Sequence, residues 1–500
     1  VLVFEQDGAF HFRSNGLPEA TATPLGTPPT LDSQNMLGTF PVLLRPDSRS
    51  ALIVGLGAGK AVNGVPVSVE EVDVIELEPK VIEANRYVSA RRKSDPLQDS
   101  RLSLFINDAR SALALTSKKY DVIVSQPSHP WSAGASHLYT VEYMQLVADH
   151  LNESGIFLQW INTQFVDERL LKSLCATILD VYPNVRVYQW APQVLFFVAS
   201  DQPMNVERQI MTTGRPFRDD PFFYLEQGIA ATEDVIAALM LGEQGVRAFS
   251  AGSQVITDDF NMMAMESAAL VREGRELDIS DLAETLKPWI PALDSESWVH
   301  QLPAGSLQYS RIADKYVSLQ MRTLRPELVG ALRDAGNPQY LLVEGQLRDG
   351  EGKREEAQEL FAAAVQAMPD SNQAKYALVE PWLRYLEDGQ APEEIVAVAN
   401  SMTGSARAVV EASKAVVRKD LQTVADLDRL LATAVPADPW FSEAVKFRVD
   451  WRSSVSNPEL TKQLSEQAWR ILDLAMANRN DHEFFAMRVF SASRADRPRR

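Results

Sequence analysis

The stretch Ala51-Leu-Ile-Val-Gly-Leu-Gly-Ala-Gly59 decides how the first part of this chain folds. Its apolar run predicts a strand buried on both faces. The three glycines that follow predict a tight turn where backbone N–H groups can approach a ligand. A second apolar strand, Val72-Asp-Val-Ile-Glu76, ends in an acid about 20 residues further on, where such an acid holds a ribose in nucleotide-binding folds. Together the two stretches predict a nucleotide-type site.

Alternating strand and helix signals extend outward from this stretch. We expect strands at 51–55, 72–76, 102–107, 120–125 and 155–161, and helices at 34–44, 78–85 and 140–151. This alternation is typical of a parallel sheet covered by helices on both faces. Residues 185–190 and 194–198 are separated by too few residues for a crossover, so they predict an antiparallel pair. A parallel sheet closed by such a hairpin is a class I methyltransferase-like Rossmann fold.

Composition narrows the class of protein. The 500 residues are too many for one core, and the net charge of −18 argues against a nucleic-acid partner. The single cysteine, Cys175, excludes an intrachain disulfide, and its apolar helical setting predicts a buried structural thiol. The six histidines are scattered, so we expect no metal site. No apolar run reaches the ~18 residues of a membrane span, and we expect a cytoplasmic protein, or a membrane-associated parent if the chain is a fragment.

The chain divides into four predicted parts. Residues 1–48 form a small N-terminal β region, residues 49–270 the Rossmann domain, residues 271–335 a helical connector and residues 336–500 an α-helical domain. The last part resembles tetratricopeptide (TPR) repeats, because small and large residues recur at the positions of a 34-residue unit. These residues are Gly345, Ala357, Phe361, Ala364 and Pro369, with Ala391 and Ala425 two further steps of 34 along the chain.

Several motifs in order support a family resemblance. They are Ser14-Asn-Gly16, Ser33-Gln-Asn-Met-Leu37, Gly55-Leu-Gly-Ala-Gly59, Val74-Ile-Glu-Leu-Glu-Pro79, Asn107-Asp-Ala-Arg110 and Tyr120-Asp-Val-Ile-Val-Ser-Gln-Pro-Ser-His-Pro-Trp131. As a set they resemble the spermidine synthase (aminopropyltransferase) family, and most closely its bacterial spermidine synthase-like branch. The resemblance covers roughly residues 1–265. It implies a transferase of polyamine biosynthesis that uses decarboxylated S-adenosylmethionine or S-adenosylmethionine, with a small-molecule substrate and a homodimer as a candidate assembly.

The resemblance also implies which residues form the site. The cofactor half consists of Gln34, Gly55, Gly57, Gly59, Glu76, Asp108 and Ala109. The gate half is the loop from Gln126 to Trp131, including Ser128, with Tyr139 expected to close over it. Gln126 and His129 occupy the catalytic positions. For Glu76 a solvent-facing strand end is the alternative interpretation, and for Asp108 a helix N-cap. Trp131 either stacks on a ligand or pins the loop, and His129 is either a general base or a loop residue.

The acids that bind the amine in this family are replaced here. Asn35, Ala58, Gln126 and His129 stand where family members carry carboxylates. An amide accepts a hydrogen bond but does not neutralise an ammonium group, so the acceptor is expected to be less cationic than a diamine. A catalytically silent nucleoside-binding scaffold, joined to a TPR-like domain that binds another protein, is the alternative. A nicotinamide oxidoreductase is disfavoured because Lys60 stands where its glycine motif needs Gly or Ala.

Overall fold

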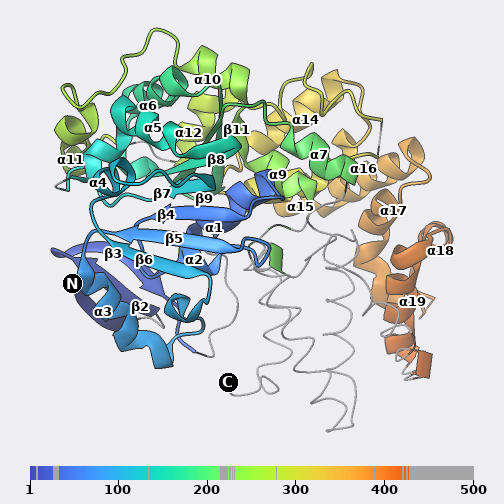
Figure 1. Cartoon of the computed structure of the whole chain (residues 1–500). Helices are drawn as coiled ribbons and strands as arrows, with labels where there is room; N and C mark the ends of the chain where they lie inside the picture. Colours follow the sequence, from blue (N-terminus) through green and yellow to red (C-terminus); the bar gives the residue numbers. More distant parts are fainter. Residues whose placement is uncertain are drawn as a thin grey trace. The chain divides into compact units, whose positions relative to one another are not determined.

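The glycine loop lies at the carboxyl end of strand β4, in the interior of a large sheet (Figure 1). The computed structural model describes residues 1–426 except 7–8, 26–32, 133, 214–222, 225–226, 228, 230, 277–278, 304, 388, 419, 421 and 424–425. Residue contacts divide the chain into two compact units. Unit 1 comprises 1–27, 32–216 and 238–291, and unit 2 comprises 28–31, 217–237 and 292–500. The four-part division expected from the sequence stays a prediction.

Unit 1 holds two sheets and the helices that cover them. Its strands are β1 (Leu2–Gln6), β2 (Ala9–Ser14), β3 (Leu17–Ala22), β4 (Ser50–Val54), β5 (Glu71–Glu76), β6 (Leu102–Ile106), β7 (Tyr120–Ser125), β8 (Leu151–Asn162), β9 (Asn184–Ala191), β10 (Val194–Ser200) and β11 (Leu239–Leu241). Its helices are α1 (Ser33–Leu44), α2 (Lys60–Asn63), α3 (Pro79–Val88), α4 (Ala109–Ala114), α5 (Val141–Asp149), α6 (Glu168–Val181), α7 (Val206–Thr213), α10 (Glu243–Phe249), α11 (Met262–Glu273) and α12 (Ile279–Leu286).

The large sheet confirms the predicted fold class. Within the described residues its strand order is β11-β9-β10-β8-β7-β4-β5-β6. Strands β8, β7, β4, β5 and β6 run parallel to one another. Strand β10 pairs antiparallel with both β8 and β9. Strand β4 is fully buried from Ala51 to Val54 because both of its faces are covered. The sheet is therefore parallel and closed by an antiparallel hairpin.

The structure differs from the sequence-based expectation around strand β8 and in strand β11. The helix predicted at 140–151 ends at Asp149, because Leu151 already begins β8. Strand β8 starts four residues earlier than predicted, with Ser154 in a left-handed conformation (φ 59°) at its irregular start. Strand β11 was missed altogether; it has three residues and pairs with β9 directly after a helix. A strand this short carries no readable alternation.

The small N-terminal sheet packs beside helix α3, as Figure 1 shows. Its strand order is β1-β2-β3, all antiparallel, and the β2–β3 turn places Asn15 and Gly16 at positive φ. Phe10 and Phe12 from β2 form an apolar cluster with Ala58 of the glycine loop and Val88 of α3. The predicted N-terminal β region is therefore present and is packed against the loop that opens the large sheet.

Unit 2 is helical in its described residues. Its helices are α9 (Thr232–Ala238), α13 (Tyr309–Ser318), α14 (Leu324–Asp334), α15 (Tyr340–Gly350), α16 (Arg354–Ala367), α17 (Asn372–Val379), α18 (Glu393–Asn400) and α19 (Gly404–Arg418). Helices α15 and α16 pack closely, since a Cβ on Gly345 would lie 2.4 Å from the Phe361 ring. The helical C-terminal region is confirmed. Its assignment to the TPR class stays a prediction, and Ala425 lies outside the described residues.

Candidate functional site

The expected site residues collect at one edge of the large sheet. Strands β7, β4, β5 and β6 are parallel neighbours, so their carboxyl ends lie side by side. Gly55 follows β4, Glu76 ends β5, Asp108 follows β6 and Gln126 follows β7. The chain runs from β4 to β5 and β6 on one side and then to β7 on the other. Ligands of open α/β sheets bind at such a reversal of strand order.

The three glycines of the loop serve different purposes. Gly55, Gly57 and Gly59 all have positive φ, at 93°, 52° and 74°. A Cβ on Gly59 would lie 2.2 Å from Cγ of Pro96, so this glycine is required by packing. A Cβ on Gly57 would meet its nearest neighbour, Cβ of Ala20, at 3.4 Å, an ordinary contact distance. Packing therefore does not require glycine at position 57, where the positive φ and the close backbone approach that a glycine allows to a ligand explain the residue.

Glu76 holds the glycine loop in shape. Its side chain is 7% exposed, so the alternative of a solvent-facing strand end is wrong. One carboxylate oxygen accepts a hydrogen bond from the Leu56 backbone N–H at 2.8 Å, and the other accepts from the Glu78 N–H at 2.8 Å. A carboxylate offers about four acceptor sites. Glu76 thus fixes the loop and keeps acceptor capacity for the hydroxyls of a ribose.

The outer side of the loop is tied to helix α3 and the segment after it. Asn85 donates to the Gly57 carbonyl at 2.8 Å, and Arg92 donates to the Ala58 carbonyl and to Asn85. Burial lowers the pKa of Arg92 to about 10. The side chain of Ala58 is 2% exposed and packs in the apolar cluster with the N-terminal sheet. An acid at position 58 would be buried among apolar groups, which explains the alanine.

Asp108 and Ala109 begin helix α4. Asp108 is exposed and caps the helix, because its carboxylate accepts from the Ser111 N–H at 2.9 Å. The N-cap interpretation is therefore correct. Only one of the two carboxylate oxygens caps the helix, so the other oxygen of this exposed side chain is available to accept a hydrogen bond from a ligand. Ala109 is buried. Gln34, the remaining residue of the cofactor half, is half-buried in the first turn of α1.

Gln126 is bound to the glycine loop. Its amide nitrogen donates to the Gly55 carbonyl at 2.6 Å, and its backbone N–H donates to Val54 at 3.2 Å. An aspartate at this position could not donate to that carbonyl. The glutamine therefore joins the gate half to the cofactor half, a structural role that its position in the motif did not reveal.

Ser128 contacts a carboxylate that the sequence did not point to. Its hydroxyl lies 2.8 Å from both carboxylate oxygens of Glu19, which belongs to strand β3. Burial raises the pKa of Glu19, the hydrogen bond from Ser128 opposes this, and the nearby Glu76 carboxylate raises it further. The gate half, expected to lack acids, therefore receives one from the N-terminal sheet. Residues 19 and 128 are 109 positions apart, and no local motif connects them.

His129 and Trp131 pack in an aromatic cluster. Trp131 lies edge-on to Phe165 at 5.2 Å between ring centroids, and His129 lies 5.0 Å from Trp131 and 5.2 Å from Phe165. Trp160 at the end of β8 also meets Phe165 edge-on. These contacts favour Trp131 as a residue that pins the loop. Burial lowers the pKa of His129, which favours the neutral form of the ring.

Tyr139 lies in the core. Its side chain is fully buried, and its hydroxyl has no hydrogen-bond partner among the described residues. Burial, and to a lesser degree Tyr143, raises the pKa of Tyr139. The Tyr143 hydroxyl in turn donates to Ser125 at the end of β7. Tyr139 is thus a core residue, and a role for it in closing over the site stays a prediction.

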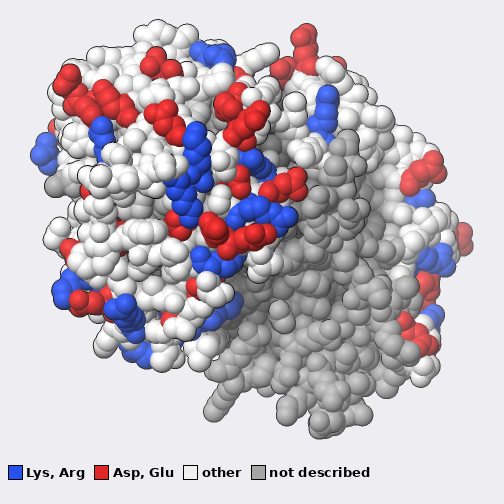
Figure 2. Space-filling model, in the orientation of Figure 1, with Lys and Arg blue, Asp and Glu red and all other residues white. Residues whose placement is uncertain are grey.

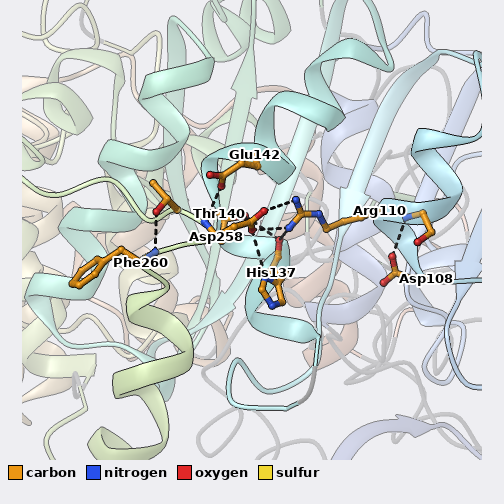
Figure 3. Close-up of polar contacts among 9 residues, drawn as sticks. Asp108, Arg110, His137, Thr140, Glu142, Asp258 and Phe260 are labelled. Carbon is orange, nitrogen blue, oxygen red and sulfur yellow. Dashed lines mark hydrogen bonds and ion pairs between the residues drawn. The ribbon is translucent and has the colours of Figure 1, made fainter.

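Asp258 ties a later segment of the chain to helix α4 (Figure 3). Arg110 donates to both carboxylate oxygens at 2.7 Å, Thr140 donates at 2.8 Å and the His137 ring lies at 3.3 Å. The pKa of Asp258 lies well below its usual range, chiefly because of the hydrogen bonds from Arg110. Asp258 therefore anchors this segment through side-chain contacts. It fixes the helix that Asp108 caps.

Other features of the described residues complete the site's surroundings. No group of three or more His, Cys, Asp or Glu side chains in the described part of the chain is placed to hold a metal ion. In the same residues no helix is long and apolar enough to cross a membrane. Cys175 is fully buried, and burial raises the pKa of its thiol. Figure 2 shows Lys and Arg side chains interspersed with Asp and Glu on the face in view.

Comparison with known proteins identifies similar sequences. Residues 31–195 match the family model of the spermine/spermidine synthase domain. A polyamine aminopropyltransferase of Methanocaldococcus jannaschii is 32% identical over 148 residues, which are 29% of this chain and 50% of that protein. The Thermotoga maritima polyamine aminopropyltransferase is 30% identical over 155 residues, 31% of this chain and 52% of that protein. The chain thus spans about half the length of these relatives.

One solved structure that matches part of this chain is a spermidine synthase in complex with the transition-state analogue AdoDATO. It is 22% identical, covers 43% of this chain and 79% of the solved chain, and has a TM-score of 0.36. The family match and the relatives confirm the resemblance that the motifs predicted.

Proposed function

We propose that residues 31–195, a spermine/spermidine synthase domain, work with the N-terminal sheet to bind an adenosyl-sulfonium cofactor and to transfer its alkyl group to an amine. The observation that carries this proposal is the buried Glu76 carboxylate, which accepts the Leu56 N–H and so holds the glycine loop in its positive-φ conformation. The cofactor fits these residues: the glycine loop presents backbone without side chains, and Glu76 and Asp108 offer oxygens to the hydroxyl and amino groups of a nucleoside.

Decarboxylated S-adenosylmethionine, when bound, supplies an aminopropyl carbon on a sulfonium: the new C–N bond forms as the C–S bond breaks, and its electron pair stays on sulfur in a neutral thioether. The protein's part is then to position the amine and to accept one proton from it. His129 is the candidate proton acceptor, because the neutral imidazole, which burial beside Trp131 and Phe165 favours, has a ring nitrogen that can take a proton. The cofactor half holds the nucleoside while the gate half directs the amine.

A second function is favoured by Gln126. Its amide is bound to the Gly55 carbonyl at 2.6 Å and cannot act as a base. In this alternative the domain binds a nucleoside without turnover, and the helical region that follows binds a protein. The TPR-like class of that region, a homodimer and the cytoplasmic location remain predictions that accompany either function.

Calorimetric titration distinguishes these functions. Wild-type protein is titrated with methylthioadenosine, decarboxylated S-adenosylmethionine and S-adenosylmethionine, and turnover with putrescine is then measured. Binding with turnover supports the transferase. Binding without turnover, combined with activity in Gln126→Asp, supports the silent scaffold. Binding of none of the three nucleosides would contradict both.

A further inference from the structure

We infer that the carboxylate of Glu19 binds a primary ammonium group of a ligand in this site. The inference rests on the proposed function and extends it, because the sequence had suggested that the acids of the amine side are lost. Glu19 belongs to β3, yet its carboxylate lies against Ser128 of the gate loop. The acid thus comes from a different part of the fold than the replaced ones.

The surroundings of Glu19 favour a cationic partner. The side chain is half-buried, and in the part of the chain that the structure describes it forms no ion pair with Lys or Arg. Lys60 donates to Thr21, two residues further along the same strand, at 3.0 Å. A carboxylate that has lost part of its water and has no cation beside it is costly to keep ionised. An ammonium group from a ligand would offset that cost by neutralising the carboxylate, and it would add a charge-assisted hydrogen bond.

The position of Glu19 places this ammonium group in the proposed site. Ala20, the next residue along β3, lies against Gly57 of the glycine loop. Ser128 is two residues after Gln126, which is bound to Gly55. The Glu76 carboxylate is near enough to raise the pKa of Glu19. Glu19 therefore lies between the glycine loop and the gate loop, where the two halves of the site meet.

Two ligands carry a primary ammonium group that could reach this point. One is the aminopropyl tail of decarboxylated S-adenosylmethionine, and the other is the acceptor amine. If the tail is bound, Glu19 also disfavours S-adenosylmethionine, because that cofactor bears a carboxylate next to its ammonium group. Methylthioadenosine has no amine in its tail and serves as the reference ligand for both cases.

The test compares Glu19→Gln with wild-type protein and with the control Glu5→Gln. Glu5 lies on β1 of the same small sheet, is exposed, and pairs with Arg91 at 3.9 Å. Affinities are measured by calorimetry for methylthioadenosine, for both sulfonium cofactors, and for putrescine with saturating methylthioadenosine. Glu19→Gln should bind methylthioadenosine as wild type does. It should lose about 10- to 100-fold in affinity for the ligand whose ammonium group Glu19 binds. Glu5→Gln should leave the affinities for methylthioadenosine and for the ammonium-bearing ligands unchanged.

The outcomes separate the inference from the function it rests on. A loss confined to decarboxylated S-adenosylmethionine assigns Glu19 to the cofactor tail, and a loss confined to putrescine assigns it to the acceptor. If wild type binds methylthioadenosine and Glu19→Gln changes no affinity, the inference is overturned and the proposed function stands. If wild type does not bind methylthioadenosine, the proposed function fails first. Should Glu19→Gln not fold, Glu19→Asp, which keeps the charge but shortens the side chain by one methylene, replaces it in the same comparison with a smaller expected loss.

Discussion

The cofactor half and the gate half of the site are held together in different ways. In the cofactor half, Glu76 binds the backbone of a loop only 20 residues before it, within one strand–helix–strand unit. In the gate half, Ser128 binds Glu19 across 109 residues and between two sheets. The first arrangement is contained in a local motif, and the second exists only in the folded chain. Loss of acids from a motif is therefore a weak argument for loss of an acidic site.

Gly59→Ala should have the largest effect on stability, because the added methyl group would clash with Pro96 in the cofactor half. The new Cβ would lie 2.2 Å from Pro96 in a left-handed conformation, so we expect a loss of about 2–4 kcal/mol in the free energy of unfolding. Urea denaturation measures it. The matched variant Gly57→Ala meets Ala20 at 3.4 Å and should cost about 1 kcal/mol. Equal losses in the two variants would show that the glycines do not differ in purpose.

Glu76→Gln should rank second and should affect binding as well as stability. An amide can accept from Leu56 or from Glu78 but not from both with the present geometry, so we expect a loss of about 2 kcal/mol in unfolding free energy. The affinity of Glu76→Gln for methylthioadenosine should also fall. The control is Glu83→Gln, an exposed residue of α3 whose ion pair with Lys80 is on the surface. Normal binding by Glu76→Gln would remove Glu76 from the nucleoside site.

Asp258→Asn tests the segment that supports α4 from outside both halves. Breaking the two hydrogen bonds from Arg110 should lower the free energy of unfolding at pH 7 by about 1–2 kcal/mol. Because the pKa of Asp258 is depressed in the folded protein, its contribution is complete above the ordinary range of Asp and is lost as the pH falls.

The difference between wild type and Asp258→Asn should therefore be constant from pH 5 to 8 and shrink below about pH 4. The adjacent Asp259 is exposed, so Asp259→Asn should show no such difference. A difference in unfolding free energy between wild type and Asp258→Asn that stays constant to the lowest pH would contradict the assigned role of the carboxylate.

Gln126→Glu should have the smallest effect on stability, and it tests the link between the halves. The variant keeps the shape of the side chain but cannot donate to the Gly55 carbonyl, which should cost about 1 kcal/mol. Methylthioadenosine should bind several-fold more weakly because Gly55 begins the loop. Unchanged binding would mean that the two halves are independent of this contact.

Sequence reasoning captured what periodicity and glycine spacing encode. The buried run before Gly55 and the acid at Glu76 predicted β4, β5 and their loop, and the short connection after Ala191 predicted the antiparallel pair. It could not find Glu19, because the turn at Asn15 and Gly16 predicts only a hairpin and not what that hairpin faces. Nor could it show that Ala58 packs against Phe10 and Phe12. This packing explains why an alanine stands at position 58, where family members carry a carboxylate.

The most direct test of the difference between the halves is the affinity for methylthioadenosine in wild type, Glu76→Gln and Glu19→Gln, measured by calorimetry under one set of conditions. We predict that wild type and Glu19→Gln bind it equally and that Glu76→Gln binds it more weakly. No binding by wild type, or an equal loss in both variants, would contradict a nucleoside site built by Glu76 and the glycine loop with a separate ammonium site at Glu19.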